Sequence, residues 1–166
     1  MTTEGLTVDT GACQLCEWER VGIPAGWFLQ EEHWSVGVYP TFPTHNPEIL
    51  HEMSKEVPGQ VVVQLRRHVG SLTDMSEEEL SSMGPLLALV TGAIEAVTQP
   101  ERVYFACFAE AVPHIHVMLT PRGSGVAQQD RGAVLLTRAG AGRYSDLNDF
   151  VAVAARIRAI LQSGRP

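Results

Sequence analysis

The segment Val112-Pro113-His114-Ile115-His116-Val117-Met118-Leu119-Thr120-Pro121-Arg122 alternates aliphatic side chains with histidine and methionine. Successive side chains of a β-strand point to opposite faces, so this alternation predicts a strand over residues 114–120 with Ile115 and Val117 in a core. His114, His116 and Met118 would share the other face, with the two imidazoles about 6–7 Å apart. Such a pair can bind a metal ion, or attack a substrate and relay protons. Two surface histidines on a half-exposed strand explain the segment equally well when it is taken alone.

Two helices and four further strands are predicted around this segment. Residues 76–79, Ser-Glu-Glu-Glu, have the pattern of a capping box. Apolar side chains then recur at three- and four-residue steps from Leu80 to Val97, which predicts a long helix that Pro85 bends and Pro100 ends. A second amphipathic pattern from residue 147 predicts a C-terminal helix. The predicted strands are residues 27–30, 34–39, 60–67, 102–109 and 114–120. Strands in a run with one inserted helix predict an α+β fold with an antiparallel sheet.

Length and charge limit the classes of protein to consider. The 166 residues fit one domain that buries most of its apolar surface. The net charge of −7 repels polyphosphate backbones, so neither a nucleic acid nor an anionic membrane is an expected partner. The sequence contains no run of 18 apolar residues, so we predict no membrane-spanning segment. Residues 1–12 are polar and do not have the pattern of a signal peptide, so we expect a flexible leader, a single domain over residues 13–166 and a cytoplasmic location.

The cysteines indicate a metal site. Cys13-x-x-Cys16 has the spacing of half a tetrahedral zinc site. A thioredoxin-like redox pair and a chance spacing are the alternatives, although the redox pair belongs in a βαβ unit, which the predicted strands do not form. His68 at the end of one predicted strand and His114 at the start of another could supply the two remaining ligands. Cys107 falls within the predicted strand 102–109, where we expect a core residue.

These features together resemble the histidine-triad (HIT) family. The resemblance is carried by residues 59–72, the capped helix and residues 112–122, in that order, and it spans approximately residues 13–122. The family pattern is His-x-His-x-His followed by apolar residues, often ending in Pro-Arg. The chain is most similar to the zinc-containing bacterial-type branch, with Met118 in place of the third histidine.

The resemblance implies a HIT-like fold, in which a five-stranded antiparallel sheet carries one long helix and which usually pairs as a homodimer. It implies that His116 is the nucleophile, which attacks the α-phosphorus of a nucleotide and forms a covalent intermediate. It also implies one zinc ion per chain, held by Cys13, Cys16, His68 and His114. Four protein ligands leave no open coordination position, so this zinc would be structural.

Three departures from the family pattern fall on the substrate side. Met118 cannot donate a proton to a leaving group, as the third histidine can. Gln60 replaces an additional active-site histidine, and Tyr39 replaces the acidic residue that contacts the ribose. An insertion around residues 44–57 also falls in the nucleotide-binding region. Arg122, at the end of the motif, is either a phosphate contact or a surface arginine. We therefore expect an intact scaffold whose chemistry or substrate has changed.

Two functional hypotheses follow. The favoured one is an enzyme, a hydrolase or nucleotidyl transferase that acts on a nucleotide phosphoester or phosphoramidate through a covalent His116 intermediate. The alternative is a repurposed HIT-like scaffold, which has either a different, less charged substrate or a non-catalytic ligand-binding role. Both hypotheses make a small molecule the partner, with Gln60, Met118, Tyr39 and Arg122 as candidate contacts.

Overall fold

The computed structural model describes residues 13–23, 26–38, 57–109, 112–136, 143–144 and 146–164. Tyr39, residues 1–12 and residues 44–56 of the expected insertion lie outside these ranges. The predictions made for them stay predictions.

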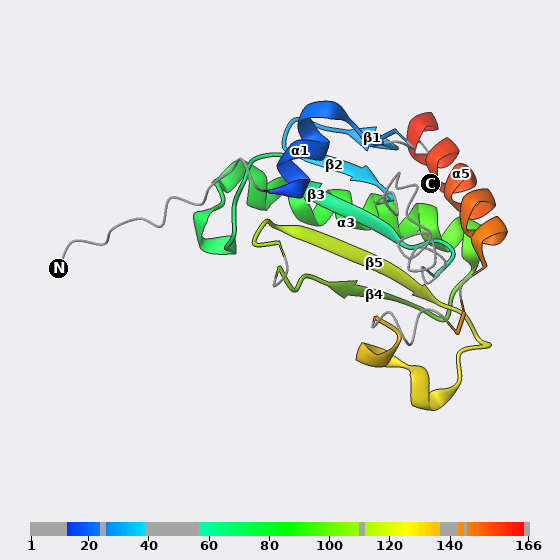
Figure 1. The fold of residues 1–166 in the computed structure, drawn as a ribbon. Helices are drawn as coiled ribbons and strands as arrows, with labels where there is room; N and C mark the ends of the chain where they lie inside the picture. The colour runs from blue at the N-terminus through cyan, green and yellow to red at the C-terminus, as the bar shows by residue number, and fades with distance from the viewer. Residues whose placement is uncertain are drawn as a thin grey trace.

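A five-stranded antiparallel sheet forms the centre of the molecule (Figure 1). Its strands are β1 (Leu29–Gln30), β2 (Trp34–Gly37), β3 (Val61–Leu65), β4 (Arg102–Ala106) and β5 (His116–Arg122). The spatial order is β1-β2-β3-β5-β4, and every neighbouring pair is antiparallel. The α+β fold and its antiparallel sheet, as predicted, are confirmed. Because β5 lies between β3 and β4, side chains on both neighbouring strands flank its residues.

The strands form where they were predicted but with different ends. β5 begins at His116, so the prediction that His114 alternates with it inside the strand is wrong. The His114 amide donates to the Val112 carbonyl at 2.8 Å, within a tight turn. The next backbone amide, that of Ile115, donates to the carbonyl of the distant Val69 at 2.7 Å. Likewise, β4 ends at Ala106. Cys107 therefore lies beyond the strand and is exposed, which corrects its predicted place in the core.

Helix α3 (Glu77–Thr98) is the long helix that the sequence predicts. The capping box forms, since the Ser76 hydroxyl accepts from the Glu79 amide at 3.2 Å and the Glu79 carboxylate accepts from the Ser76 amide at 2.8 Å. The helix is unbroken at Pro85. The predicted apolar stripe packs against the core except at its first residue, Leu80, which is 43% exposed. The buried apolar residues are Leu86, Val90, Ala93 and Ile94.

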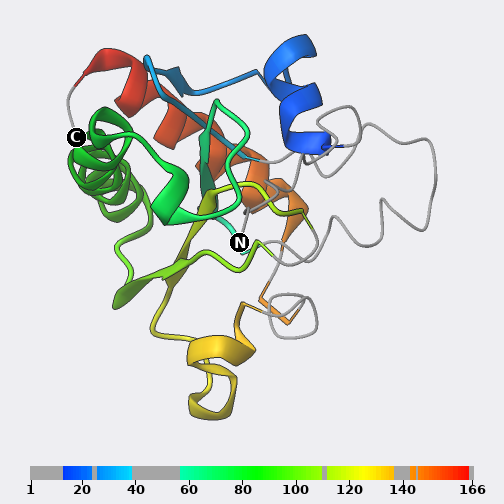
Figure 2. The same cartoon turned by 90° about the vertical axis from the view of Figure 1, so that its left-hand side faces the viewer.

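Two more helices flank the sheet. The C-terminal helix α5 (Leu147–Ser163) forms as predicted and packs against α3 and β1. Helix α1 (Gln14–Val21) is not predicted from the sequence; Cys13 immediately precedes it and Cys16 lies in its first turn. In Figure 2, α3 lies on one side of the sheet and α1 on the other. The two faces of β5 therefore meet different surroundings.

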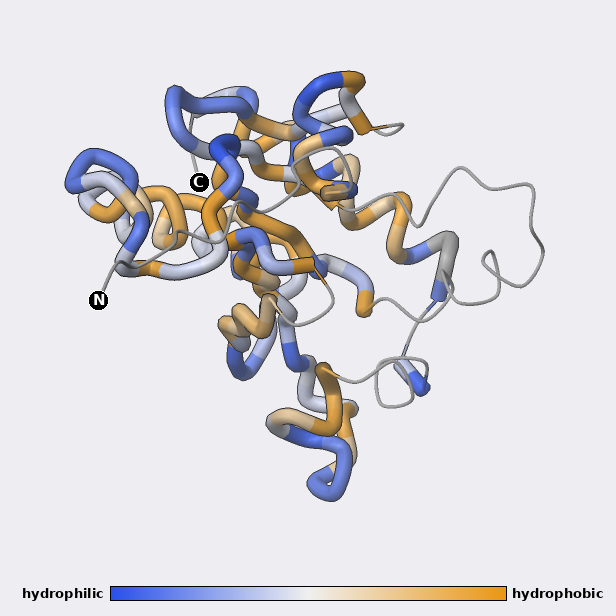
Figure 3. The backbone as a smooth tube through the Cα atoms, turned by 60° about the vertical axis from the view of Figure 1, so that its left-hand side comes forward, coloured by the Kyte–Doolittle hydropathy of each residue, from blue (hydrophilic) through white to orange (hydrophobic). Residues whose placement is uncertain are grey.

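The main core lies between the sheet and the two long helices. The aliphatic residues of β3 and β5 that point toward α3, Val63 and Val117 among them, belong to one buried cluster with Val90 and Ile157. The strands and α3 are largely hydrophobic in Figure 3, whereas the connecting loops are hydrophilic. By length and composition α3 could span a membrane. Core helices meet the same test, and here α3 covers the sheet.

A smaller cluster lies beyond the end of β5. Val57, Val126 and Leu135 are buried against Tyr104 and Tyr144. The chain there forms two short 3-10 turns, Gln128–Asp130 and Gly132–Val134, and the Tyr144 hydroxyl donates to the buried Asp130 carboxylate at 2.6 Å. This segment projects from the β4–β5 side of the sheet in Figure 1.

Candidate functional site

His116, Met118 and Thr120 share the face of β5 that points away from α3. Val117 and Leu119 belong to the main core, and strand geometry places the alternate residues on the opposite face. His116 pairs with Gln64 of β3, while Met118 pairs with Val62 on one side and Ala106 on the other. His116 is half-buried, and this is the face on which α1 lies.

The His116 ring is held in a defined orientation. Its Nδ1 lies 2.6 Å from the carbonyl oxygen of His114. A carbonyl can only accept a hydrogen bond, so Nδ1 carries the proton in this contact. In the neutral ring the lone pair then resides on Nε2, and this tautomer is the one that a nucleophilic histidine requires if Nε2 is the attacking atom.

An apolar row crosses the sheet next to His116. Gly37 of β2 pairs with Val62, which in turn pairs with Met118. A side chain on Gly37 would come within 2.8 Å of Ile23 and 3.1 Å of Trp27, so these two residues cover the row. The Trp27 indole nitrogen is buried and has no hydrogen-bond partner among the described residues. The immediate neighbours of Met118 thus offer apolar surface rather than positive charge.

Gln64 is a residue that the sequence reasoning missed. Its side chain is fully buried beside His116, and its amide nitrogen donates to the Leu15 carbonyl at 3.0 Å and to the Glu19 carboxylate at 3.1 Å. Both partners belong to α1, so Gln64 fastens that helix to the sheet. A glutamine within a run of valines was the only signal in the sequence, and nothing there identified its partners.

Cys13, Cys16, His68 and His114 come together at one end of the sheet. Their possible ligand atoms all lie within 4.8 Å of one another. The His114 Nδ1 lies 3.4 Å from the Cys13 sulfur and 3.6 Å from the Cys16 sulfur, and the His68 Nδ1 lies 3.2 Å from the Cys16 sulfur. Tetrahedral zinc with ordinary bond lengths separates sulfur and nitrogen ligands by about 3.6 Å. The donor set and its spacing therefore fit a four-coordinate zinc ion.

The protonation state and tautomer of His114 also fit a metal ligand. Its Nε2 lies 2.6 Å from the Leu65 carbonyl oxygen, so Nε2 carries the proton and Nδ1 is left to face the two sulfurs. Burial lowers the pKa of His114, opposed by the hydrogen bond to Leu65, and the neighbouring charges of His68 and His116 lower it further. A neutral ring with this tautomer is the form that binds a metal.

The cysteine pair needs a positive charge nearby. Burial, together with the hydrogen bond and charge of Cys13 and the charge of Glu19, raises the pKa of the Cys16 thiol to about 11. Two thiolates this close are unfavourable without a cation between them. His68 differs from His114 in one respect, because its buried Nε2 has no hydrogen-bond partner among the described residues. A metal-bound histidine is usually fixed by a hydrogen bond from its other ring nitrogen. His114 makes this bond to Leu65, and His68 makes none with the described residues.

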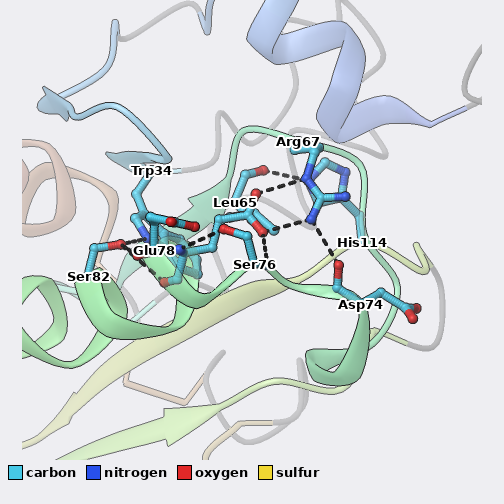
Figure 4. Close-up of polar contacts among 9 residues, drawn as sticks. Trp34, Leu65, Arg67, Asp74, Ser76, Glu78, Ser82 and His114 are labelled. Atoms are coloured by element: carbon cyan, nitrogen blue, oxygen red, sulfur yellow. Dashed lines mark hydrogen bonds and ion pairs between the residues drawn. The ribbon is translucent and has the colours of Figure 1, made fainter.

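An ion pair fixes the segment that leads into His68. The Arg67 guanidinium donates to both carboxylate oxygens of Glu79, at 2.9 and 2.7 Å, and to the Asp74 carbonyl at 2.9 Å. Figure 4 shows Arg67, Asp74 and Ser76 gathered at the start of α3, close to His114. Glu79 also closes the capping box of α3. Its carboxylate therefore connects the start of α3 to Arg67, the residue before the candidate ligand His68.

The remaining predicted substrate residues are more scattered. The Gln60 side-chain oxygen accepts from the Thr120 hydroxyl at 3.1 Å, which places Gln60 beside the face that carries Met118. Arg122 lies six residues beyond His116, or about 20 Å along the strand. Its side chain is 8% exposed and is paired with Glu101 at 2.5 Å. Arg122 is thus not brought to His116, and the interpretation as a surface arginine is also wrong because the side chain is buried.

Solved structures of other proteins have the same arrangement of elements. A HIT-like protein involved in cell-cycle regulation from Bartonella henselae is 16% identical, with 92% of this chain and 98% of that chain covered and a TM-score of 0.61. The fold is HIT-like. A histidine triad nucleotide-binding protein from Sulfolobus tokodaii, itself described as hypothetical, is 12% identical over 91% and 93% of the two chains, also with a TM-score of 0.61.

A zinc-bound histidine triad family protein from Mycobacterium smegmatis is 18% identical, with 94% of this chain and 99% of that chain covered and a TM-score of 0.55. No family model matches this sequence, and no curated protein matches it either. At these identities the similarity establishes the HIT-like fold. It does not establish the chemistry.

Proposed function

We propose that this chain is an enzyme that hydrolyses or transfers a nucleotide phosphoester or phosphoramidate group through a covalent His116 intermediate. The observation that carries the proposal is the contact between the His116 Nδ1 and the His114 carbonyl, because it selects the tautomer with its lone pair on Nε2. The ring also lies on the face of the sheet away from the main core, where a substrate could reach it.

The reaction would proceed in two displacements. His116 Nε2 forms a bond to the phosphorus while the bond from phosphorus to the leaving oxygen or nitrogen breaks. The ring gains positive charge, which the carbonyl dipole of His114 stabilises through the Nδ1 proton. Water or another acceptor then attacks the phosphorus and loses a proton to solvent, while the bond from phosphorus to Nε2 breaks and His116 leaves with its original tautomer restored. Met118 cannot supply the proton that the first leaving group takes up, so that proton comes from solvent or from the substrate itself.

The proposal includes one structural zinc ion per chain, with Cys13, Cys16, His68 and His114 as ligands. Bound there, zinc would cross-link the start of α1, the segment after β3 and the turn before β5. The zinc-bound histidine triad protein of the same fold supports this assignment. We further propose a cytoplasmic homodimer. Phe105 is 55% exposed on β4, the last strand of the sheet, and a second copy could cover it.

The test is turnover of adenosine phosphoramidate and a panel of dinucleoside polyphosphates by the zinc-loaded protein and its His116→Ala variant. Turnover that disappears in the variant, while zinc content and circular dichroism stay unchanged, is the expected result. A phosphorylated or nucleotidylated His116 peptide, trapped by acid-free quenching and mass spectrometry, would identify the intermediate. Equal turnover by the two proteins would exclude His116 as the nucleophile.

The alternative function is favoured by the apolar row beside His116. Met118 has Val62 and Ala106 as its cross-strand neighbours, so this surface suits a less charged ligand than a polyphosphate. The discriminating variant is Met118→His combined with Gln60→His. Increased nucleotide hydrolysis would show that the surface around His116 still accepts nucleotides. No turnover by either folded, zinc-loaded protein would favour the repurposed scaffold or a binding role.

A further inference from the structure

A cavity lies on the opposite side of the sheet from His116. It has a volume of about 810 Å³ and is formed by the turn between β1 and β2 together with the first half of α3. Trp34 points to this side, since its indole nitrogen donates to the Ser82 hydroxyl of α3 at 3.0 Å. Figure 4 shows Trp34, Ser82 and Glu78 next to one another. The size is that of a ligand-binding cleft.

The cavity combines an apolar lining with acidic walls. The accessible apolar surface comes from the exposed Pro85 and the half-buried Leu89, which lie over the buried Trp34 and Leu86. The exposed Glu31 and Glu32 stand on the β1–β2 turn, and the exposed Glu78 stands on α3 across the cavity. Hydrogen bonds from its own backbone and from Ser76 lower the pKa of Glu78, so its carboxylate is ionised at neutral pH.

The negative charge of these walls is not neutralised locally. Arg66 reaches the turn, but it donates to the backbone carbonyls of Glu31 and Glu32, at 3.1 and 3.4 Å, rather than to their carboxylates. Among the described residues that line the cavity there is one imidazole, His33, and no lysine or arginine.

A neighbouring cavity provides the contrast. It has a volume of about 830 Å³ and borders Cys16, and it shares Glu32 and His33 with the first cavity. Its lining contains three arginines and three glutamates, Glu32 included. There Arg66 pairs with Glu19 and Arg67 pairs with Glu79, at 3.3 and 2.7 Å. The excess of negative charge is thus specific to the first cavity.

We propose that this first cavity, named here the Trp34 groove, binds a basic peptide segment in which lysine or arginine side chains flank an apolar residue. Carboxylates on both walls match two separated positive charges, and the apolar lining between them matches an aliphatic side chain. A simple cation would leave the apolar lining in water, and a neutral apolar ligand would remove the carboxylates from water without compensation. The proposal does not depend on catalysis by His116.

The experiment uses the full-length, zinc-loaded protein labelled with 15N at pH 7.5. The probe is the peptide Lys-Leu-Leu-Lys, acetylated and amidated at its ends, and the reporters are the Trp34 indole N–H and the Ser82 amide. Saturable shifts of these signals are expected. Glu31→Gln with Glu32→Gln should weaken binding about 2- to 30-fold, because it removes two exposed charge pairs.

The control variant is Glu95→Gln with Asp149→Asn, which changes the net charge equally at exposed positions away from the groove. It should bind the peptide as the unmodified protein does. Lys-Ser-Ser-Lys and spermidine should bind more weakly than Lys-Leu-Leu-Lys, since both lack the aliphatic side chains. The proposal is overturned if the signals do not move, if both variants lose affinity equally, or if the three probes bind alike.

Discussion

Glu79→Gln should destabilise the protein in a way that depends on pH. Hydrogen bonds from Arg67 lower the pKa of Glu79 from 4.5 to about 2, against the opposing effect of burial. At 1.36 kcal/mol for each pKa unit, this difference corresponds to about 3 kcal/mol of folding free energy. The Arg67 side chain is 53% exposed, so water screens the pair and we expect about 2 kcal/mol. Glutamine can still close the capping box, so the substitution removes the charge and one hydrogen bond from Arg67 but keeps the cap.

The sign of the pH dependence follows from the lowered pKa. A carboxyl group whose pKa is lower in the folded state stabilises the protein fully above its unfolded pKa, and this stabilisation is lost as the pH falls from about 4.5 to about 2. The difference in unfolding free energy between unmodified and Glu79→Gln protein should therefore be largest at pH 7. It should shrink to less than half by about pH 3.

Urea unfolding followed by circular dichroism at several pH values measures this difference. The matched control is Glu77→Gln, which removes an exposed carboxylate from the same first helical turn and should cost no more than about 0.5 kcal/mol. Taking differences between variants also cancels the effect of acid on the metal site. The reasoning is refuted if both variants cost the same, or if the cost of Glu79→Gln does not change with pH.

Three further predictions concern the metal site and the packing. Cys13→Ser should lose most of the bound zinc by elemental analysis and at least about 3 kcal/mol of unfolding free energy, whereas Cys107→Ser should retain about one zinc per chain; equal zinc in both variants would contradict the ligand assignment. Gly59→Ala should cost about 1–3 kcal/mol in urea unfolding, because Gly59 has a φ of 91° and an added Cβ would lie 2.7 Å from the Thr98 methyl group. Gly84→Ala, with nothing within 4 Å, should instead stabilise α3 by about 0.5–1 kcal/mol, and a loss of stability there would show that the helix surface is covered.

Local signals in the sequence were sufficient for most of the fold. The alternation around Val117 predicted β5, and the Ser76–Glu79 pattern predicted the start of α3, because both depend on residues close together in the chain. The exposure of Leu80 at the start of α3 was harder to predict. Residues 80–94 contain no charged side chain, so no polar face identifies the solvent side of the helix. The packing against the sheet decides it instead.

Contacts between distant residues account for what the sequence did not reveal. Gln64 bonds to α1 residues 45 and 49 positions away, and no local pattern encodes those partners. The four metal-site residues were proposed by resemblance, and the structure brings their side chains together. His114 was misplaced because a strand pattern continued to it. Its actual position is set by a turn and by the sulfur atoms that its ring faces.

His114 connects the metal cluster to the candidate nucleophile. Its Nδ1 faces the sulfurs of Cys13 and Cys16, its Nε2 is anchored to Leu65, and its carbonyl oxygen holds the His116 Nδ1. Since one residue makes all of these contacts, a shift of the His114 backbone would move both the ring that faces the sulfurs and the carbonyl that orients His116. The departures from the family pattern at Met118 and Gln60 lie farther along the same face of the sheet. A change of substrate could therefore proceed there while the positioning of the nucleophile stayed intact.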